Sequence, residues 1–193
     1  MTKYDQIIYD TAVRQGFTPT AAKFVVAQAR FESSNYSSNV FKNNNNTSGM
    51  KYIGQPLATR GTLAPLSERS QTCQKGGSCQ NSDHYAKFAS VADSARDKIE
   101  RLYNKTMGGV TPQQLKNAKS PEDFAQLLKA RRYYGEQKGQ SPAQSVKEYG
   151  SGLRSLMTRI QVVEFIEKNK IMLVLGVGIL LITGTYYFYY KKS

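Results

Sequence analysis

A glutamate at the end of an apolar helical stripe is the residue in this sequence best suited to acid–base chemistry. Glu32 is the second-last residue of the segment PTAAKFVVAQARFES and follows Phe24, Val25 and Gln28 by eight, seven and four positions. These spacings place Glu32 on the same helical face as the apolar side chains. An apolar face and a helix C-terminus both disfavour a negative charge, which favours a carboxyl that can donate a proton. Glu32 is therefore the candidate general acid, and an ordinary glutamate at a frayed helix end is the alternative.

The remaining reactive side chains are few. The chain has one histidine and two cysteines among 193 residues, too few for most metal sites or for a dense disulfide framework. His84 stands in the polar stretch NSDHYAK, where we expect a solvated side chain rather than a base. Cys73 and Cys79 bracket QKGGS and could form a local disulfide, with two free thiols as the alternative. We expect no metal and no organic cofactor.

Helix-start signals recur along the chain. A serine or threonine followed by proline places a capping oxygen before a residue that suits the first helical turn. Such pairs predict helices that begin after Thr18, Thr111, Ser120 and Ser141. Further helices are predicted after Ser90, which forms a possible capping box with Asp93, and over residues 3–15.

Residues 35–89 have a different character. FKNNNNTSG and QKGGSCQNSD are rich in turn formers and lack a helical period, which predicts loops and at most one short hairpin. The expected fold is therefore mainly α, of the α+β type: a helical domain over residues 1–158 with a small loop or β lobe.

The C-terminal segment reads as a membrane anchor. Residues 171–190, IMLVLGVGILLITGTYYFYY, form a run of twenty residues without a charge. As a helix this run would match a hydrocarbon core of roughly 30 Å, and its four tyrosines would suit an interface. We expect a linker over 159–170, one transmembrane helix over 171–190 and a basic tail over 191–193. The first residues, MTKYDQIIYDTAV, do not resemble a signal peptide.

Four short motifs in order resemble a known enzyme family. AKFVVAQARFESSNYSSNVF and NNNNTSGMK resemble the core of the bacterial N-acetylglucosaminidase family that includes the flagellar muramidase domain, glycoside hydrolase family 73. That family's helix ends in Ala-x-x-Glu-Ser-Gly-Trp and continues to Asn-Asn-Leu-Phe-Gly-Ile-Lys. YAKFASVADSARDKIERLY and LKARRYYGE…SVKEYGSGLRSL extend the resemblance, which covers about residues 15–158.

The resemblance implies a lysozyme-like fold and an activity. It implies cleavage of a β-1,4 glycosidic bond in the glycan strands of peptidoglycan, with Glu32 as the general acid. Asn46 matches the second motif and is a candidate substrate-binding residue. Tyr133 matches a late tyrosine of the family that would orient the sugar or stabilise charge, and Tyr134 follows it. Packing roles are the alternative for both tyrosines.

The sequence also departs from the family pattern. Ser34-Asn35-Tyr36 replaces the Gly-Trp that follows the family's Glu-Ser, although Tyr36 could still offer a flat face to a sugar. The family's second acid has no clear copy: Glu68 is the nearest candidate and Asp83 the other. Because an inverting hydrolase needs a second carboxylate, a lytic transglycosylase and a catalytically inactive wall-binding or structural membrane protein stay open.

The charge of the chain suggests its partners. With 27 basic and 14 acidic side chains the formal net charge is +13, and most of the excess lies before residue 161. Nucleic acid could attract such a chain, but the basic residues are scattered and no nucleic-acid motif is present. We expect peptidoglycan and a lipid membrane as partners, and no nucleic acid. The predicted location is the virion membrane of a bacteriophage or a bacterial cell envelope.

Overall fold

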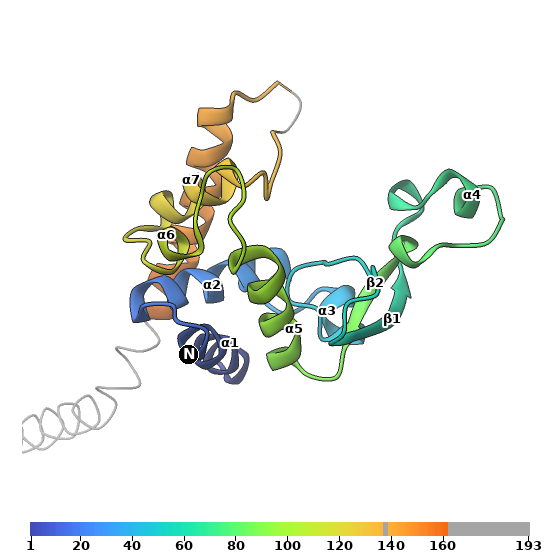
Figure 1. Cartoon of the computed structure of the whole chain (residues 1–193), viewed down its shortest axis with the longest axis horizontal. Coiled ribbons are helices and arrows are strands. Elements are labelled where there is room, and N and C mark those ends of the chain that lie inside the picture. The colour runs from blue at the N-terminus through green and yellow to red at the C-terminus, as the bar shows by residue number, and fades with distance from the viewer. Residues whose placement is uncertain (137–138, 162–193) are drawn as a thin grey trace, which may run out of the picture. The chain divides into compact units, whose positions relative to one another are not determined.

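The computed structural model describes residues 1–136 and 139–161 (Figure 1). Residues 2–157 form one compact unit, to which the following description refers. No helix among the described residues has the length and the apolar content that a membrane crossing requires. The predicted span over 171–190 and the basic tail over 191–193 lie outside the described residues, as does most of the predicted linker.

The predicted helix starts are confirmed. The hydroxyl of each predicted capping residue accepts a hydrogen bond from the main-chain N–H three residues later. The bond from Ala21 to Thr18, at 3.2 Å, is one example. The capping residues are Thr18, Ser90, Thr111, Ser120 and Ser141. The helices are α1 (Lys3–Arg14), α2 (Pro19–Glu32), α5 (Val91–Lys98), α6 (Pro112–Lys116) and α7 (Pro121–Ala130). Within this unit the chain is helical again from residue 142 to residue 157.

The core forms around α2, which packs against α1, α6 and α7. Its residues 24–29 are all buried, so the helix presents no solvated face at its centre. The Phe24 and Tyr103 rings lie 5.8 and 6.1 Å from the ring of Phe124, measured between centroids. This aromatic cluster and the surrounding aliphatic side chains hold α2 firmly, which fixes the position of Glu32 at its C-terminus.

A small β lobe, whose strands follow α3 (Asn39–Asn44) and precede α5 in the chain, packs beside α3 (Figure 1). Strands β1 (Ala58–Leu63) and β2 (His84–Phe88) pair antiparallel, with Ala58 opposite Phe88. The mainly α fold with a small lobe agrees with the prediction, but two details do not. The strands are joined by the long connection 64–83, which contains short helices where only loop was expected. The turn-forming sequence also contains the helix α3, which starts because Ser38 caps it.

The connection between the strands is long and contains short helical segments. It contains η1 (Leu66–Glu68), α4 (Gln71–Gln74) and η2 (Asn81–Asp83). Cys73 and Cys79 are joined by a disulfide, with their Cα atoms 4.5 Å apart. Asp83 is buried and accepts hydrogen bonds from the main-chain N–H groups of Ser70 (2.5 Å) and Gln80 (2.7 Å). These bonds lower the pKa of the Asp83 carboxyl, and the bond from Ser70 has the largest effect. The Asp83 oxygens are thus engaged in hydrogen bonds that stabilise the lobe.

Candidate active site

Glu32 is surrounded by hydrogen-bond donors from distant parts of the chain. The Tyr133 hydroxyl lies 2.8 Å from both carboxylate oxygens of Glu32. The Tyr149 hydroxyl lies 3.1 Å from Glu32 Oε1, and the Gln28 amide lies 3.3 Å from the same oxygen. The Glu32 side chain is only partly buried, so it remains open to a substrate. The structure thus brings two of the predicted site residues, Glu32 and Tyr133, into contact.

A buried glutamine connects these donors to the core. Gln28 stands one helical turn before Glu32 and is fully buried. Its amide nitrogen donates to the Tyr149 hydroxyl at 3.0 Å, and its amide oxygen accepts from the Tyr103 hydroxyl. Because both ends of the amide are engaged, its orientation is fixed, and it orients Tyr149 and Glu32 in turn.

The tyrosine hydroxyls in this cluster act as donors. Burial raises the pKa of Tyr133 well above its usual value, and the nearby carboxylate of Glu32 raises it further. The same two causes, in the same order, raise the pKa of Tyr149 and that of Tyr103. The three phenols therefore keep their protons at neutral pH. Neutral donors can hold the carboxylate in place without forming an ion pair with it.

The segment after α7 places Tyr133. The buried guanidinium of Arg131 donates to the main-chain oxygens of Val110 (2.8 Å), Leu102 and Lys105 (2.5 Å), which joins the end of α7 to the preceding loop. Gly108 has a φ of +56° and lies so close to α7 that a Cβ would overlap the carbonyl of residue 130. This close packing against the end of α7 helps to fix the segment that carries Tyr133, which follows the left-handed residue Arg132 (φ 57°).

Tyr134 supports the same site through packing. Its ring stacks on that of Tyr149 with centroids 4.3 Å apart and an interplanar angle of 13°. Its hydroxyl donates to the main-chain oxygen of Ala125 at 2.9 Å, and burial raises the pKa of Tyr134 to about 12. These contacts place Tyr149 over Glu32. A substrate-binding role for Tyr134 stays a prediction.

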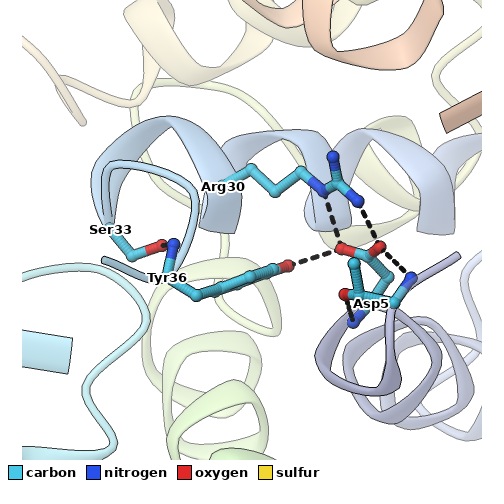
Figure 2. Close-up of polar contacts among 5 residues, drawn as sticks. Asp5, Arg30, Ser33 and Tyr36 are labelled. Carbon is cyan, nitrogen blue, oxygen red and sulfur yellow. Dashed lines mark hydrogen bonds and ion pairs between the residues drawn. The ribbon is translucent and has the colours of Figure 1, made fainter. Parts of the chain in front are cut away.

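A second polar cluster fixes the other side of the α2 terminus. Figure 2 shows that the Arg30 side chain and the Tyr36 hydroxyl converge on the Asp5 carboxylate, which lies in α1. Arg30 Nε and the Tyr36 hydroxyl each lie 2.8 Å from Asp5 Oδ1, and a second guanidinium nitrogen binds Oδ2. Burial alone would raise the pKa of Asp5, but hydrogen bonds from Arg30, Thr2 and Tyr36 outweigh it, and the pKa is lowered.

The backbone directly after Glu32 has an uncommon conformation. Ser34, Asn35 and Tyr36 have φ angles of 52°, 55° and 64°, in the left-handed region that side chains other than glycine rarely adopt. The Ser33 hydroxyl accepts from the Tyr36 N–H at 2.9 Å and helps hold this turn (Figure 2). The Tyr36 ring packs against Phe41 at 5.1 Å, and its hydroxyl is engaged by Asp5. Its role as a sugar platform stays a prediction.

Asn46 organises the loop that the second motif forms. It is buried, its amide nitrogen donates to the main-chain oxygens of Met50 (2.8 Å) and Ala86 (2.9 Å), and its oxygen accepts from main-chain N–H groups. The structure gives Asn46 this role in the loop, and substrate binding by it stays a prediction.

Glu68 lies in the β lobe in surroundings unlike those of Glu32. The side chain is exposed and forms an ion pair with Lys51 Nζ at 2.8 Å, and the Tyr85 hydroxyl lies 3.3 Å from the same oxygen. The hydrogen bond from Lys51 holds the pKa of the Glu68 carboxyl below its usual value. Glu68 is thus an ionised carboxylate with its own partners, and its role as a second acid stays a prediction.

Sequence reasoning missed several residues of the cluster. Gln28 carried a usable signal, because a polar residue four positions before Glu32 interrupts an apolar stripe. Tyr103 and Tyr149 are separated from Gln28 by 75 and 121 positions and carried no local signal. Only the fold brings them to Glu32.

Comparison with known proteins identifies the family. Residues 12–162 match the glucosaminidase family, described as mannosyl-glycoprotein endo-beta-N-acetylglucosaminidase. The chain belongs to this family. The glucosaminidase match spans well over half of the 193 residues and includes Glu32, Tyr133 and Tyr149. The protein is therefore a glycoside hydrolase. A comparison with curated protein sequences gave no match.

Two solved structures share the fold of this glucosaminidase. One is a type VI secretion system effector–immunity complex from Pseudomonas protegens, with 17% identity over 81% of this chain and 90% of that chain, and a TM-score of 0.51. The other is the catalytic domain of the autolysin Auto from Listeria monocytogenes, with 20% identity over 86% of this chain and 89% of that chain, also at 0.51. At these identities the likeness concerns the fold.

Proposed function

We propose that this glucosaminidase cleaves β-1,4 glycosidic bonds in the glycan strands of peptidoglycan, with Glu32 as the general acid. The observation that carries the proposal is the placement of Glu32, a partly exposed carboxyl held by the Tyr133 and Tyr149 hydroxyls at 2.8–3.1 Å. The family supports a substrate with N-acetylglucosamine units, and an autolysin with the same fold supports the bacterial wall as its source.

The geometry suggests how the bond breaks. Protonated Glu32 donates its proton to the glycosidic oxygen as that bond lengthens, and the sugar ring flattens toward an oxocarbenium-like state. The Tyr133 hydroxyl, which reaches both carboxylate oxygens, then donates to the carboxylate that remains. Because this donor is already in place, little reorganisation accompanies proton transfer.

A lytic transglycosylase is the second candidate. This reaction needs a single acid, because a hydroxyl of the substrate replaces water as the attacking group. The ion pair between Glu68 and Lys51 favours it, since an exposed carboxylate neutralised by a cation is a weakened base. The sequence had also left open a wall-binding protein without activity, and both the glucosaminidase family and the intact donor set around Glu32 weigh against it.

Product analysis tests the proposal and separates these candidates. Purified peptidoglycan is incubated with the full-length protein, and the soluble fragments are examined by chromatography and mass spectrometry. Hydrolysis predicts new reducing ends, whereas transglycosylation predicts 1,6-anhydro ends. Wall binding without new ends of either kind contradicts the proposed activity.

The cellular location is a further part of the proposal. We expect the predicted span over 171–190 to anchor the enzyme in a virion membrane of a bacteriophage or in a bacterial envelope. The disulfide between Cys73 and Cys79 supports exposure of the domain to an oxidising compartment. Detection of the protein in the cytosolic fraction alone, with neither membranes nor virions containing it, contradicts this location.

A further inference from the structure

A lysine lies fully buried next to Tyr133 of the candidate active site. Lys98 is the last residue of α5, directly before the π-helical turn η3 (Ile99–Tyr103), and is 1% exposed. Its Nζ lies 5.4 Å from the ring centroid of Tyr133 and 5.9 Å from that of Tyr103. Among the described residues, this Nζ has no hydrogen-bond partner. The turn η3 is of the rare π type, which often accompanies functional sites.

Such a side chain calls for an explanation. A buried ammonium without hydrogen bonds is costly, and an apolar side chain of similar volume would normally be more stable there. The two ring faces compensate only in part. Burial lowers the pKa of Lys98, and the Glu32 carboxylate acts in the opposite direction. The Tyr133 ring near Lys98 Nζ carries the hydroxyl that binds Glu32, so among the described residues the proposed general acid is connected to Lys98 through one phenol.

We propose that Lys98 is a positioning residue of this glycosidase, a buried cation that stabilises the carboxylate form of Glu32 through the intervening Tyr133. When Glu32 gives its proton to the leaving oxygen, it becomes an anion facing this cation. The interaction is therefore stronger in the transition state than in the ground state, as catalysis requires. Lys98 itself transfers no proton and touches no substrate. The inference rests on the proposed function of Glu32.

The charged and titratable groups around Lys98 come from several elements. Glu32 faces it from α2, and the neutral phenols of Tyr103 and Tyr133 face it from η3 and from the segment after α7. On its own helix, Asp97 lies toward Arg101, with 3.9 Å between Asp97 Oδ2 and Arg101 Nε. Glu32 is the group whose ionisation Lys98 is expected to influence.

The pH profile of peptidoglycan cleavage tests the proposal. In Lys98→Met the cation that stabilises the carboxylate form is lost, so the basic limb of the kcat profile should move to higher pH. The rate at the optimum should fall about tenfold, equivalent to about 1.4 kcal/mol. Lys98→Arg keeps the cation and should return the limb toward its wild-type position, and exposed Lys3→Met is the charge control. An unshifted limb in active Lys98→Met overturns the proposal.

A stability measurement separates this inference from the proposed function. Melting temperatures are compared for wild type, Lys98→Met, Glu32→Gln and the double variant at pH 7. Removing the cation should raise the melting temperature, and more so in Glu32→Gln, where the cation has lost its counter-charge. Equal shifts in both backgrounds overturn the role of Lys98, even if the wild type cleaves nothing. Absence of wild-type cleavage overturns only the proposed function.

Discussion

At the scale of single residues, the chemistry depends on how a half-exposed carboxyl is held. Glu32 makes its hydrogen bonds to neutral donors, two phenols and an amide, rather than to arginine or lysine. A direct ion pair would keep a carboxylate ionised and oppose its use as an acid. Phenols can orient both its protonated and its ionised forms, which is what a group that cycles between them needs.

Replacement of Tyr133 by phenylalanine tests the importance of these donors. The ring and its packing remain, but both bonds to Glu32 are lost, so kcat should fall about 100-fold with the fold intact. Kinetics on soluble glycan fragments provide the measurement. Tyr134→Phe is the matched control, because the hydroxyl it loses is bonded to the main chain at Ala125. Equal effects from the two variants would contradict the assigned role of Tyr133.

At the scale of elements, α1 and α2 are joined by the Asp5–Arg30–Tyr36 cluster, which flanks the end of the helix that carries Glu32. Asp5 is fully buried, and the Arg30 side chain is 11% exposed. We expect Asp5→Asn to lower the free energy of unfolding by about 3–5 kcal/mol, because the arginine is then buried without a counter-charge. Denaturant unfolding measures the loss. Asp10→Asn on the same helix serves as the control, and an equal loss there would contradict the account.

The Asp5 carboxylate should also make the stability of the protein depend on pH. Its pKa is lowered in the folded state, so the stability it contributes is complete above its unfolded pKa of about 3.9. That contribution is lost as the pH falls below about 4 and through the folded pKa. The melting temperature of the wild type should therefore fall more steeply with decreasing pH in this range than that of Asp5→Asn. Parallel curves would show that Asp5 does not titrate as described.

The turn after α2 also makes a prediction. Ser34 has a φ of 52°, and a glycine stands in the family pattern at this position. Relief of left-handed strain should let Ser34→Gly raise the free energy of unfolding by about 1 kcal/mol. Chemical denaturation detects this change, and Ser37→Gly, outside the left-handed stretch, should give no such gain. A loss of stability in Ser34→Gly would contradict the inference that Ser34 is strained in its left-handed conformation.

Features that depend on neighbouring residues could be predicted from the sequence, and features that depend on packing between distant segments could not. Helix starts depend on a capping oxygen and the next few residues, so Thr18 and Ser120 could be assigned from the sequence alone. Glu32 could be chosen because its helical spacing was visible. Tyr149 and Lys98 could not, because their importance depends on packing between elements that lie far apart in the chain. The short helix α3 was missed because its asparagine-rich composition is typical of turns.

At the scale of the whole molecule, we expect the net charge to govern the encounter with substrate. The formal net charge of +13 should attract an anionic cell wall over about a Debye length, and salt should weaken that attraction. A pelleting assay measures binding of the full-length protein to isolated walls. We expect this binding to fall as sodium chloride rises about tenfold, from about 50 to about 500 mM. Removal of the anionic wall polymers should reduce this dependence. Salt-independent binding would contradict an electrostatic encounter.

The central claim is that Glu32 is the acid that breaks the glycan bond, and one measurement tests it most directly. The rate at which purified peptidoglycan releases new glycan ends is compared for the wild type and for Glu32→Gln, with circular dichroism as the control for folding. We predict a folded variant whose rate is lower by at least about 1,000-fold, since the amide keeps the shape of the side chain but cannot donate the required proton. A folded Glu32→Gln variant with near wild-type cleavage would contradict the account.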